Sequence, residues 1–243
     1  MSPASGQLTI LIVDDEPPIR RLLKTSFTAQ SYRVLEAHDG QSALDALKVD
    51  SVDLVVLDLG LPGMDGFAVI EALRKKGSSI PIVVLSSRDD EVGKVKALDL
   101  GADDYVTKPF GTEELMARVR AALRHRLQAE GTTPVFRSGD LSVDLVRRIV
   151  TVRGSEVKLS PREYDLLRLL VLHAGKVLTH KFAMRELWGA TADTQYLRVY
   201  IRSLRQKVEA DPERPVHILT EQGVGYRLRV QDQAESFPPR PTF

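Results

Sequence analysis

Apolar residues in the first half of the chain follow two alternating patterns. Short, nearly continuous apolar runs, which suit strands buried in a parallel sheet, occupy residues 8–13, 54–57 and 81–85, and two further short strands are predicted at residues 32–36 and 104–107. Between them, apolar residues at helical spacing predict helices after Pro17-Pro18, over residues 40–49 and 66–76, from about residue 89, and over residues 112–126. This alternation predicts an α/β fold, a doubly wound five-stranded parallel sheet with strand order 2-1-3-4-5, in a domain spanning residues 1–126.

The pattern changes beyond residue 126. Residues 127–134 lack apolar periodicity and predict a short flexible linker. Alternating segments between residues 135 and 158 predict a small antiparallel sheet, and Ser160 to Glu163 has the capping-box pattern of a helix start. Two more helices, the last at about residues 193–209, and a hairpin of residues 216–219 and 226–230 complete an α+β domain at 135–230. The proline-rich residues 231–243 are expected to be disordered.

Composition narrows the class of protein. Of 243 residues, 43% are hydrophobic and 28% are charged, which is typical of globular proteins, and the absence of cysteine excludes thiol catalysis and disulfides. Neither a signal peptide nor a membrane-spanning run is evident, so we expect a cytoplasmic protein without a membrane partner. Residues 1–126 carry 16 basic and 19 acidic side chains, a net charge of −3, and residues 127–243 carry 18 and 14, a net charge of +4. This asymmetry suggests two domains with different partners.

Chemically active side chains follow four of the predicted strands. Asp58 ends the buried run VDLVVL, and Gly60, Pro62 and Gly63 open a loop directly after it. The other three strands end at Asp14-Asp15, Ser86 and Lys108. In the predicted sheet these ends share one edge, and strands one and three are neighbours, so Asp14, Asp15 and Asp58 are expected to meet.

Three neighbouring carboxylates repel one another, and a hard divalent cation such as Mg²⁺ resolves the conflict. Lys108 and Ser86 supply a positive charge and a hydroxyl donor for phosphoryl oxygens. Because an ionised carboxylate needs no general base to act as a nucleophile, the set predicts that Asp58 accepts a phosphoryl group.

Each residue also has a plainer explanation. Asp15 is about as well explained as a helix cap, Lys108 alone is more often a solvated lysine, and Ser86 alone would usually cap a helix. Two other functions remain open. One is an aspartate-nucleophile phosphatase, which Gly60 disfavours because it stands where a second aspartate would act as the acid. The other is a DNA-binding regulator that ignores phosphate.

The last predicted helix carries two stripes. Leu197, Ile201, Leu204 and Val208 form a core face, and one residue further round lie the arginines Arg198, Arg202 and Arg205. An arginine stripe can lie in the major groove of DNA, although such a stripe is more often a solvated face. Tyr200 on an adjacent arc and Arg227 in the hairpin strengthen the prediction of a DNA-binding surface.

The motifs LIVDDE, VVLDLGLPGMDG, PIVVLSS and GADDYVTKPF make residues 8–126 resemble a response-regulator receiver domain, which is flavodoxin-like. LSPREYDLLRLLVLHAGKVLTHKFAMRELWG, YLRVYIRSLRQKVE and GVGYR make residues 135–230 resemble the winged helix of the OmpR/PhoB subfamily. The resemblance implies a transcriptional regulator and not an enzyme. Its expected partners are a sensor histidine kinase and double-stranded promoter DNA.

The resemblance also implies roles for single residues. Asp58 would take the phosphoryl group, and Asp14, Asp15, Asp58 and the carbonyl of Gly60 would organise Mg²⁺. Ser86 and Lys108 would bind phosphate, the Lys108-Pro109 bond would be cis, and Tyr105 would be an aromatic switch. Phosphorylation would favour a two-fold homodimer through three pairs of opposite charge, namely Lys94 with Glu114, Asp104 with Arg118, and Asp99 with Arg120. Without a partner these charges are an ordinary solvated face.

Overall fold

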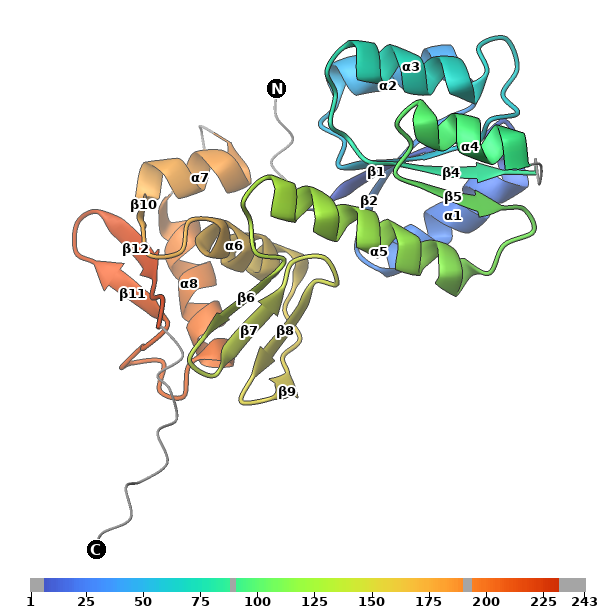
Figure 1. Cartoon of the computed structure of the whole chain (residues 1–243). Coiled ribbons are helices and arrows are strands. Elements are labelled where there is room, and N and C mark those ends of the chain that lie inside the picture. Colours follow the sequence, from blue (N-terminus) through green and yellow to red (C-terminus); the bar gives the residue numbers. More distant parts are fainter. Residues whose placement is uncertain (1–6, 88–90, 190–193, 232–243) are drawn as a thin grey trace, which may run out of the picture. The chain divides into compact units, whose positions relative to one another are not determined.

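The computed structural model describes residues 7–87, 91–189 and 194–231 and divides the chain after Pro134 into two compact units. The N-terminal unit holds the elements β1 to α5, and the C-terminal unit holds the elements β6 to β12 (Figure 1). Apart from Gln231, the predicted disordered tail lies outside the described residues.

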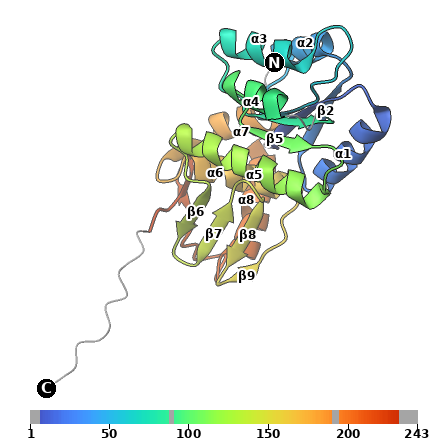
Figure 2. The ribbon, with the colours of Figure 1, turned by 45° about the vertical axis from the view of Figure 1, so that its right-hand side comes forward.

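The N-terminal unit is built on a five-stranded parallel sheet with order β2-β1-β3-β4-β5, as predicted. Helices α2, α3 and α4 cover one face of this sheet, and α1 and α5 cover the other (Figures 1 and 2). The elements are β1 (Thr9–Val13), α1 (Pro17–Ala29), β2 (Arg33–Ala37), α2 (Gly40–Val49), β3 (Leu54–Leu57), α3 (Gly66–Lys75), β4 (Ile82–Ser86), α4 (Glu91–Asp99), β5 (Asp104–Thr107) and α5 (Thr112–Ala129).

The apolar runs explain why this sheet is central. Every residue of β1, β3 and β4 is buried, because helices lie on both faces and leave these strands no solvent-exposed side. The chain leaves β3 at Asp58 and returns tightly to begin α3 at Gly66. A Cβ atom on Gly66 would lie 2.4 Å from the carbonyl oxygen of Asp58, so only glycine fits this return. The tight return holds Asp58 at the edge of the sheet.

Helix α4 packs on the sheet through its small residues. On α4, Val92, Val95 and Leu98 are 78%, 48% and 39% exposed, and the buried residues are Gly93 and Ala97. Short side chains thus face the sheet, and the apolar residues at helical spacing lie on the solvent side.

Helix α5 continues to Ala129, so the first three residues of the predicted linker are helical. Leu127 extends the buried stripe of Leu115, Val119 and Leu123 by one more turn. Beside it, the Arg126 guanidinium donates to the Asp53 carbonyl at 2.6 Å. The helix therefore ends only where these contacts end.

The C-terminal unit contains two antiparallel sheets, with orders β6-β7-β8-β9 and β10-β12-β11. The predicted hairpin is confirmed as β11 and β12, and β10 adds a third strand to it. The elements are β6 (Val135–Ser138), β7 (Leu141–Asp144), β8 (Ile149–Val152), β9 (Ser155–Glu156), α6 (Pro161–Leu172), β10 (Val177–Thr179), α7 (His180–Trp188), α8 (Thr194–Val208), β11 (Ile218–Glu221) and β12 (Gly225–Leu228).

Helices α6 and α8 show the features that the sequence predicts, although the predicted start of the last helix, at about residue 193, lies outside the described residues. The capping box of α6 is present, since Ser160 accepts from the backbone of Glu163 while the Glu163 carboxylate accepts from the backbone of Ser160. The predicted core face of α8 is buried. Figure 2 shows the four-stranded sheet beside these helices. Across the described ranges, no helix combines the length and apolarity needed to cross a bilayer.

Candidate functional site

The carboxylates of Asp14 and Asp58 meet the ammonium group of Lys108 at the carboxyl edge of the parallel sheet. Lys108 Nζ donates to Asp58 Oδ2 at 2.7 Å and to Asp14 Oδ2 at 2.8 Å. Asp14 and Asp58 are only 1% and 5% exposed. Three residues from the ends of β1, β3 and β5 therefore form one buried ionic cluster, as the strand order requires.

A third carboxylate belongs to this cluster. Lys108 Nζ also donates to Glu16 Oε1 at 3.1 Å, and carboxylate oxygens of Asp14, Glu16 and Asp58 lie within 4.8 Å of one another. Asp15 is exposed. Glu16 was not among the predicted site residues, although it directly follows the acid pair Asp14-Asp15 in the run DDE.

The cluster changes the proton affinity of its members. Burial raises the pKa of the Asp14 carboxyl, and hydrogen bonds from Lys108 and from the Glu16 backbone partly offset that rise. Burial by itself lowers the pKa of Lys108, but hydrogen bonds to Asp14 and Asp58 raise it above its ordinary value. Lys108 is therefore charged and serves as a fixed positive charge.

Backbone hydrogen bonds hold Gly60 and Ser86 at the same edge, and Tyr105 lies within β5 opposite Val84. Gly60 N–H donates to Asp58 Oδ1 at 3.0 Å, and Lys108 N–H donates to the Ser86 carbonyl at 2.8 Å. Ser86 and Tyr105 are buried, with 1% and 4% of their surface exposed. The Lys108-Pro109 peptide bond is cis, as the resemblance implied.

The donor set fits a hard divalent cation. The three clustered carboxylates offer oxygen atoms only, close enough to share one ion, and oxygen is the ligand that Mg²⁺ and Ca²⁺ prefer. The protein thus brings together an acidic nucleophile, oxygen ligands and a fixed cation. That combination suits phosphoryl transfer, in which positioning and charge neutralisation do most of the work.

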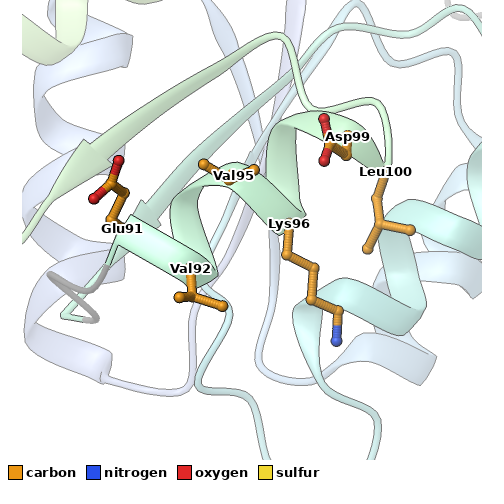
Figure 3. Close-up of a pocket in the computed structure, with 6 residues that line it drawn as sticks. All are labelled: Glu91, Val92, Val95, Lys96, Asp99 and Leu100. Atoms are coloured by element: carbon orange, nitrogen blue, oxygen red, sulfur yellow. The ribbon is translucent and has the colours of Figure 1, made fainter.

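The surface formed by α4, β5 and α5 carries the predicted dimer charges. Within the chain, Arg118 already pairs with Asp104 at 2.9 Å and with Glu114 at 2.9 Å. Lys94 and Asp99 are exposed on α4, and Arg120 is half-buried on α5. Figure 3 shows α4, where a pocket is lined by Glu91, Val92, Val95, Lys96, Asp99 and Leu100. Lys96 extends toward α3, and its Nζ lies 4.3 Å from the centre of the Phe67 ring.

The predicted DNA-binding residues of the C-terminal unit lie in different environments. Arg198 and Arg202 are exposed on α8. Arg205 donates to the Ile218 carbonyl and to Thr220, so it contacts β11. The Tyr200 ring lies 5.4 Å from the Trp188 ring, and Arg227 pairs with Glu221 at 2.6 Å.

Sequence reasoning missed a contact that joins two helices of this unit. The Glu163 carboxylate accepts from Ser203 at 2.5 Å and from Lys207 at 2.7 Å, and both donors lie on α8. The capping-box pattern predicted only the contact of Glu163 with Ser160 in the same helix, and not its contacts with α8. Nothing in the sequence alone brings residues forty positions apart to one carboxylate.

Comparison with known proteins agrees with this geometry. Residues 10–120 match the response regulator receiver domain, and residues 147–228 match the C-terminal domain of transcriptional regulatory proteins. The chain belongs to the response regulators of the OmpR/PhoB type, in which a receiver domain precedes a DNA-binding domain. Its function is therefore that of a phosphorylation-activated transcriptional regulator, and the phosphatase alternative is not favoured.

The curated relatives of the chain include proteins named KdpE. The KDP operon transcriptional regulatory protein KdpE of Escherichia coli strain K12 is 46% identical over 221 residues, which are 90% of this chain and 98% of that protein. KdpE of Mycobacterium tuberculosis strain H37Rv is 45% identical over 222 residues, with the same coverage. The sensory transduction protein RegX3 of the same strain is 41% identical over 224 residues, again covering 90% of this chain and 98% of that protein. The chain is thus an OmpR/PhoB-type regulator close to KdpE.

Proposed function

We propose that Asp58 accepts a phosphoryl group from a phosphohistidine of a KdpD-like sensor kinase. The observation that carries this proposal is the convergence of Asp58, Asp14 and Lys108 at one buried edge, with distances of 2.7 and 2.8 Å from Lys108 to the two carboxylates. In the transfer, a carboxylate oxygen of Asp58 forms a bond to phosphorus while the bond between phosphorus and the donor nitrogen breaks. The product is an acyl phosphate on Asp58.

The residues around Asp58 have different roles in this transfer. Lys108 keeps its charge and moves from the free Asp58 carboxylate to an oxygen of the bound phosphoryl group, and the Ser86 hydroxyl donates to another. Asp14, Asp15, Asp58 and the Gly60 carbonyl would hold Mg²⁺, with Glu16 beside them. When bound, the cation neutralises charge on the phosphoryl oxygens and on the crowded carboxylates.

The phosphorylated receiver then acts on the rest of the chain. We propose that Ser86 and Tyr105 rearrange around the new phosphoryl group and that the α4–β5–α5 surface forms a two-fold homodimer. The exposed Val92 and Val95 supply apolar contact area there, and Lys94, Asp99, Asp104, Glu114, Arg118 and Arg120 set the register. The dimer binds promoter DNA through α8 and the β11–β12 hairpin, with Arg198, Tyr200, Arg202 and Arg227 as the expected contacts. Arg205, the fifth predicted residue, borders this surface and holds β11.

The likeness to KdpE supports a target of the same kind. We propose that the chain works in the cytoplasm, where it controls an operon for potassium uptake. In this proposal residues 1–126 form the receiver, residues 127–134 connect it, and residues 135–230 bind DNA. The chain itself turns over no phosphate ester.

The acceptor assignment is tested with acetyl phosphate and Mg²⁺, with the acyl phosphate measured by intact mass and by its loss in hydroxylamine. The wild-type chain and the control Asp45→Ala, which changes an exposed acid on α2, are expected to gain one phosphoryl group. Asp58→Ala is expected to gain none. Normal labelling of Asp58→Ala would show that the acceptor lies elsewhere.

The regulatory assignment is tested on a promoter fragment of a potassium-uptake operon, by fluorescence anisotropy. Phosphodonor is expected to tighten binding at least about tenfold, because dimerisation lets two DNA-binding units act together. Equal affinity with and without phosphodonor would support a regulator that ignores phosphate. Rapid turnover of a phosphate ester would support the phosphatase.

A further inference from the structure

The three arginines of the α8 stripe do not share one role. Arg205 donates to the Ile218 carbonyl at 3.1 and 2.7 Å and to Thr220 Oγ1 at 2.8 Å, and its guanidinium lies 6.0 Å from the centre of the Tyr226 ring. Among the described residues, neither Arg198 nor Arg202 has a hydrogen-bond or ion-pair partner. Arg205 therefore braces the hairpin, and the other two guanidinium groups are available to a ligand.

The buried side of α8 defines which residues point furthest outward. Leu197, Ile201, Leu204 and Val208 are at most 2% exposed and mark the inner face. With 3.6 residues per turn, Val199 and Gln206 lie opposite this face to within about 10°, and Arg202 to within about 50°. Val199 is 65% exposed. The outward arc of the helix therefore has the exposed Val199 and Gln206 at its centre, and the exposed Arg202 lies on the side of the arginine stripe.

The neighbouring arc is already occupied by contacts inside the unit. Ser203 donates to the Glu163 carboxylate at 2.5 Å, and the Tyr200 ring packs 5.4 Å from the Trp188 ring. These contacts fix how α8 is rotated and leave Val199 and Arg202 facing away from the unit. An isolated exposed valine is ordinary and does not by itself indicate a binding site. Val199 suggests one because it lies beside an unpaired arginine on the outward face.

This outward pair matches the edges of particular base pairs. An apolar side chain contacts the C5 methyl of thymine, and arginine donates two hydrogen bonds to O6 and N7 of guanine. Residues three positions apart rise by about 4.5 Å along a helix, and successive base pairs are about 3.4 Å apart. Val199 and Arg202 can therefore reach adjacent base pairs.

We propose that Val199 and Arg202 are the specificity-determining pair of this protein, reading a thymine methyl and a guanine on adjacent base pairs in the major groove. In this assignment, which rests on the proposed DNA binding, Arg198 contacts a phosphate. Arg205 is a positioning residue that ties β11 to α8 and does not read bases.

The test begins by finding the site that the intact protein prefers. The full-length chain, treated with acetyl phosphate and Mg²⁺, is selected against a duplex library with a random central segment, and the enriched half-site is measured by anisotropy. The wild-type protein is expected to prefer one thymine next to one guanine. If no sequence is enriched, sequence-specific DNA binding fails and this inference fails with it.

Chemically altered bases then assign each contact to a residue. Replacing that thymine by deoxyuridine removes only the methyl group, and replacing the guanine by 7-deazaguanine removes N7. Each change is expected to weaken wild-type binding about tenfold, within the range for a single base contact. The deoxyuridine substitution is expected to leave the DNA affinity of Val199→Ala unchanged. The 7-deazaguanine substitution is expected to leave the DNA affinity of Arg202→Ala unchanged. Equal sensitivity in the wild-type chain and in these variants would overturn the inference while leaving DNA binding intact.

Two further variants separate reading from positioning. Arg198→Ala is expected to weaken binding to all sequences alike and to reduce the salt dependence by about one unit of slope. Arg205→Ala is expected to lower affinity for every sequence and the melting temperature of the C-terminal unit, with the base preferences unchanged. A changed base preference in Arg205→Ala would show that it reads DNA directly and would overturn its assigned role.

Discussion

At the scale of single residues, the buried carboxylate of Glu163 shows how one side chain orients the DNA-binding helix. It caps α6 through Ser160 and holds Ser203 and Lys207 of α8. Although burial raises the pKa of this carboxyl, the hydrogen bonds outweigh it and lower the pKa from 4.5 to about 2. The charged form of Glu163 is therefore the form that stabilises the fold.

This lowered pKa predicts how stability depends on pH. Because the pKa of the folded state lies below that of the unfolded state, the contribution is complete well above pH 4.5 and is lost as the pH falls toward 2. Unfolding free energies from urea titrations are expected to fall by about 2 kcal/mol more between pH 6 and pH 3 in the wild-type chain than in Glu163→Gln. The exposed Glu156→Gln serves as the control and should follow the wild type. Identical pH dependence in Glu163→Gln would contradict the role of the ionised carboxylate.

At the scale of elements, the three-stranded sheet of the C-terminal unit depends on one close approach. Gly225 begins β12, and a Cβ atom there would lie 1.8 Å from the Leu178 carbonyl oxygen of β10. Gly223, at the hairpin turn, has a φ of +73° and open space around it. Glycine therefore occupies the two positions for different reasons. At Gly225 the neighbouring strand packs too closely for a side chain, and at Gly223 the backbone is left-handed.

Substitutions at these glycines should distinguish the effect of close packing from the effect of backbone conformation. Gly225→Ala is expected to destabilise the C-terminal unit by several kcal/mol and to abolish DNA binding, because β10 must move away. Gly223→Asn is the matched control and should be tolerated, since asparagine adopts left-handed conformations and nothing lies nearby. Thermal unfolding followed by circular dichroism measures both, and phosphorylation of Asp58 should be unaffected. A stable, DNA-binding Gly225→Ala would refute the close-packing argument.

At the scale of the whole molecule, charge is divided between the two units. The front part has a net charge of −3 and the rear part a net charge of +4. This division suits a receiver that binds a cation and a second unit that binds a polyanion. On the receiver, the mixed charges of α4, β5 and α5 are proposed to select a second copy of the same chain.

The proposed dimer can be tested by exchanging one charge pair. Arg120→Asp places two acids opposite each other twice in a two-fold dimer, and this is expected to weaken dimerisation about tenfold. The double variant Asp99→Arg with Arg120→Asp restores opposite charges and should recover the wild-type affinity. Sedimentation velocity of the phosphorylated chains measures the dimer. Equal dimerisation in all three proteins would exclude this pairing.

The sequence by itself determined the sheet order, the capping box of α6 and the strand ends at which Asp14, Asp58 and Lys108 stand. Each follows from local periodicity, turn chemistry and one topological rule, so no long-range information was needed. It did not reveal that the helix α5 passes residue 126, since the burial of Leu127 depends on what the helix packs against.

Only the tertiary structure decided which similar side chains do different work. Asp15 and Glu16 both follow the same strand, yet the Glu16 carboxylate contacts Lys108 while Asp15 is exposed. Arg202 and Arg205 belong to one helical stripe, yet Arg205 is held by β11 and Arg202 extends outward. These differences depend on contacts between segments that are distant in the sequence, and the periodicity of the sequence does not reveal such contacts.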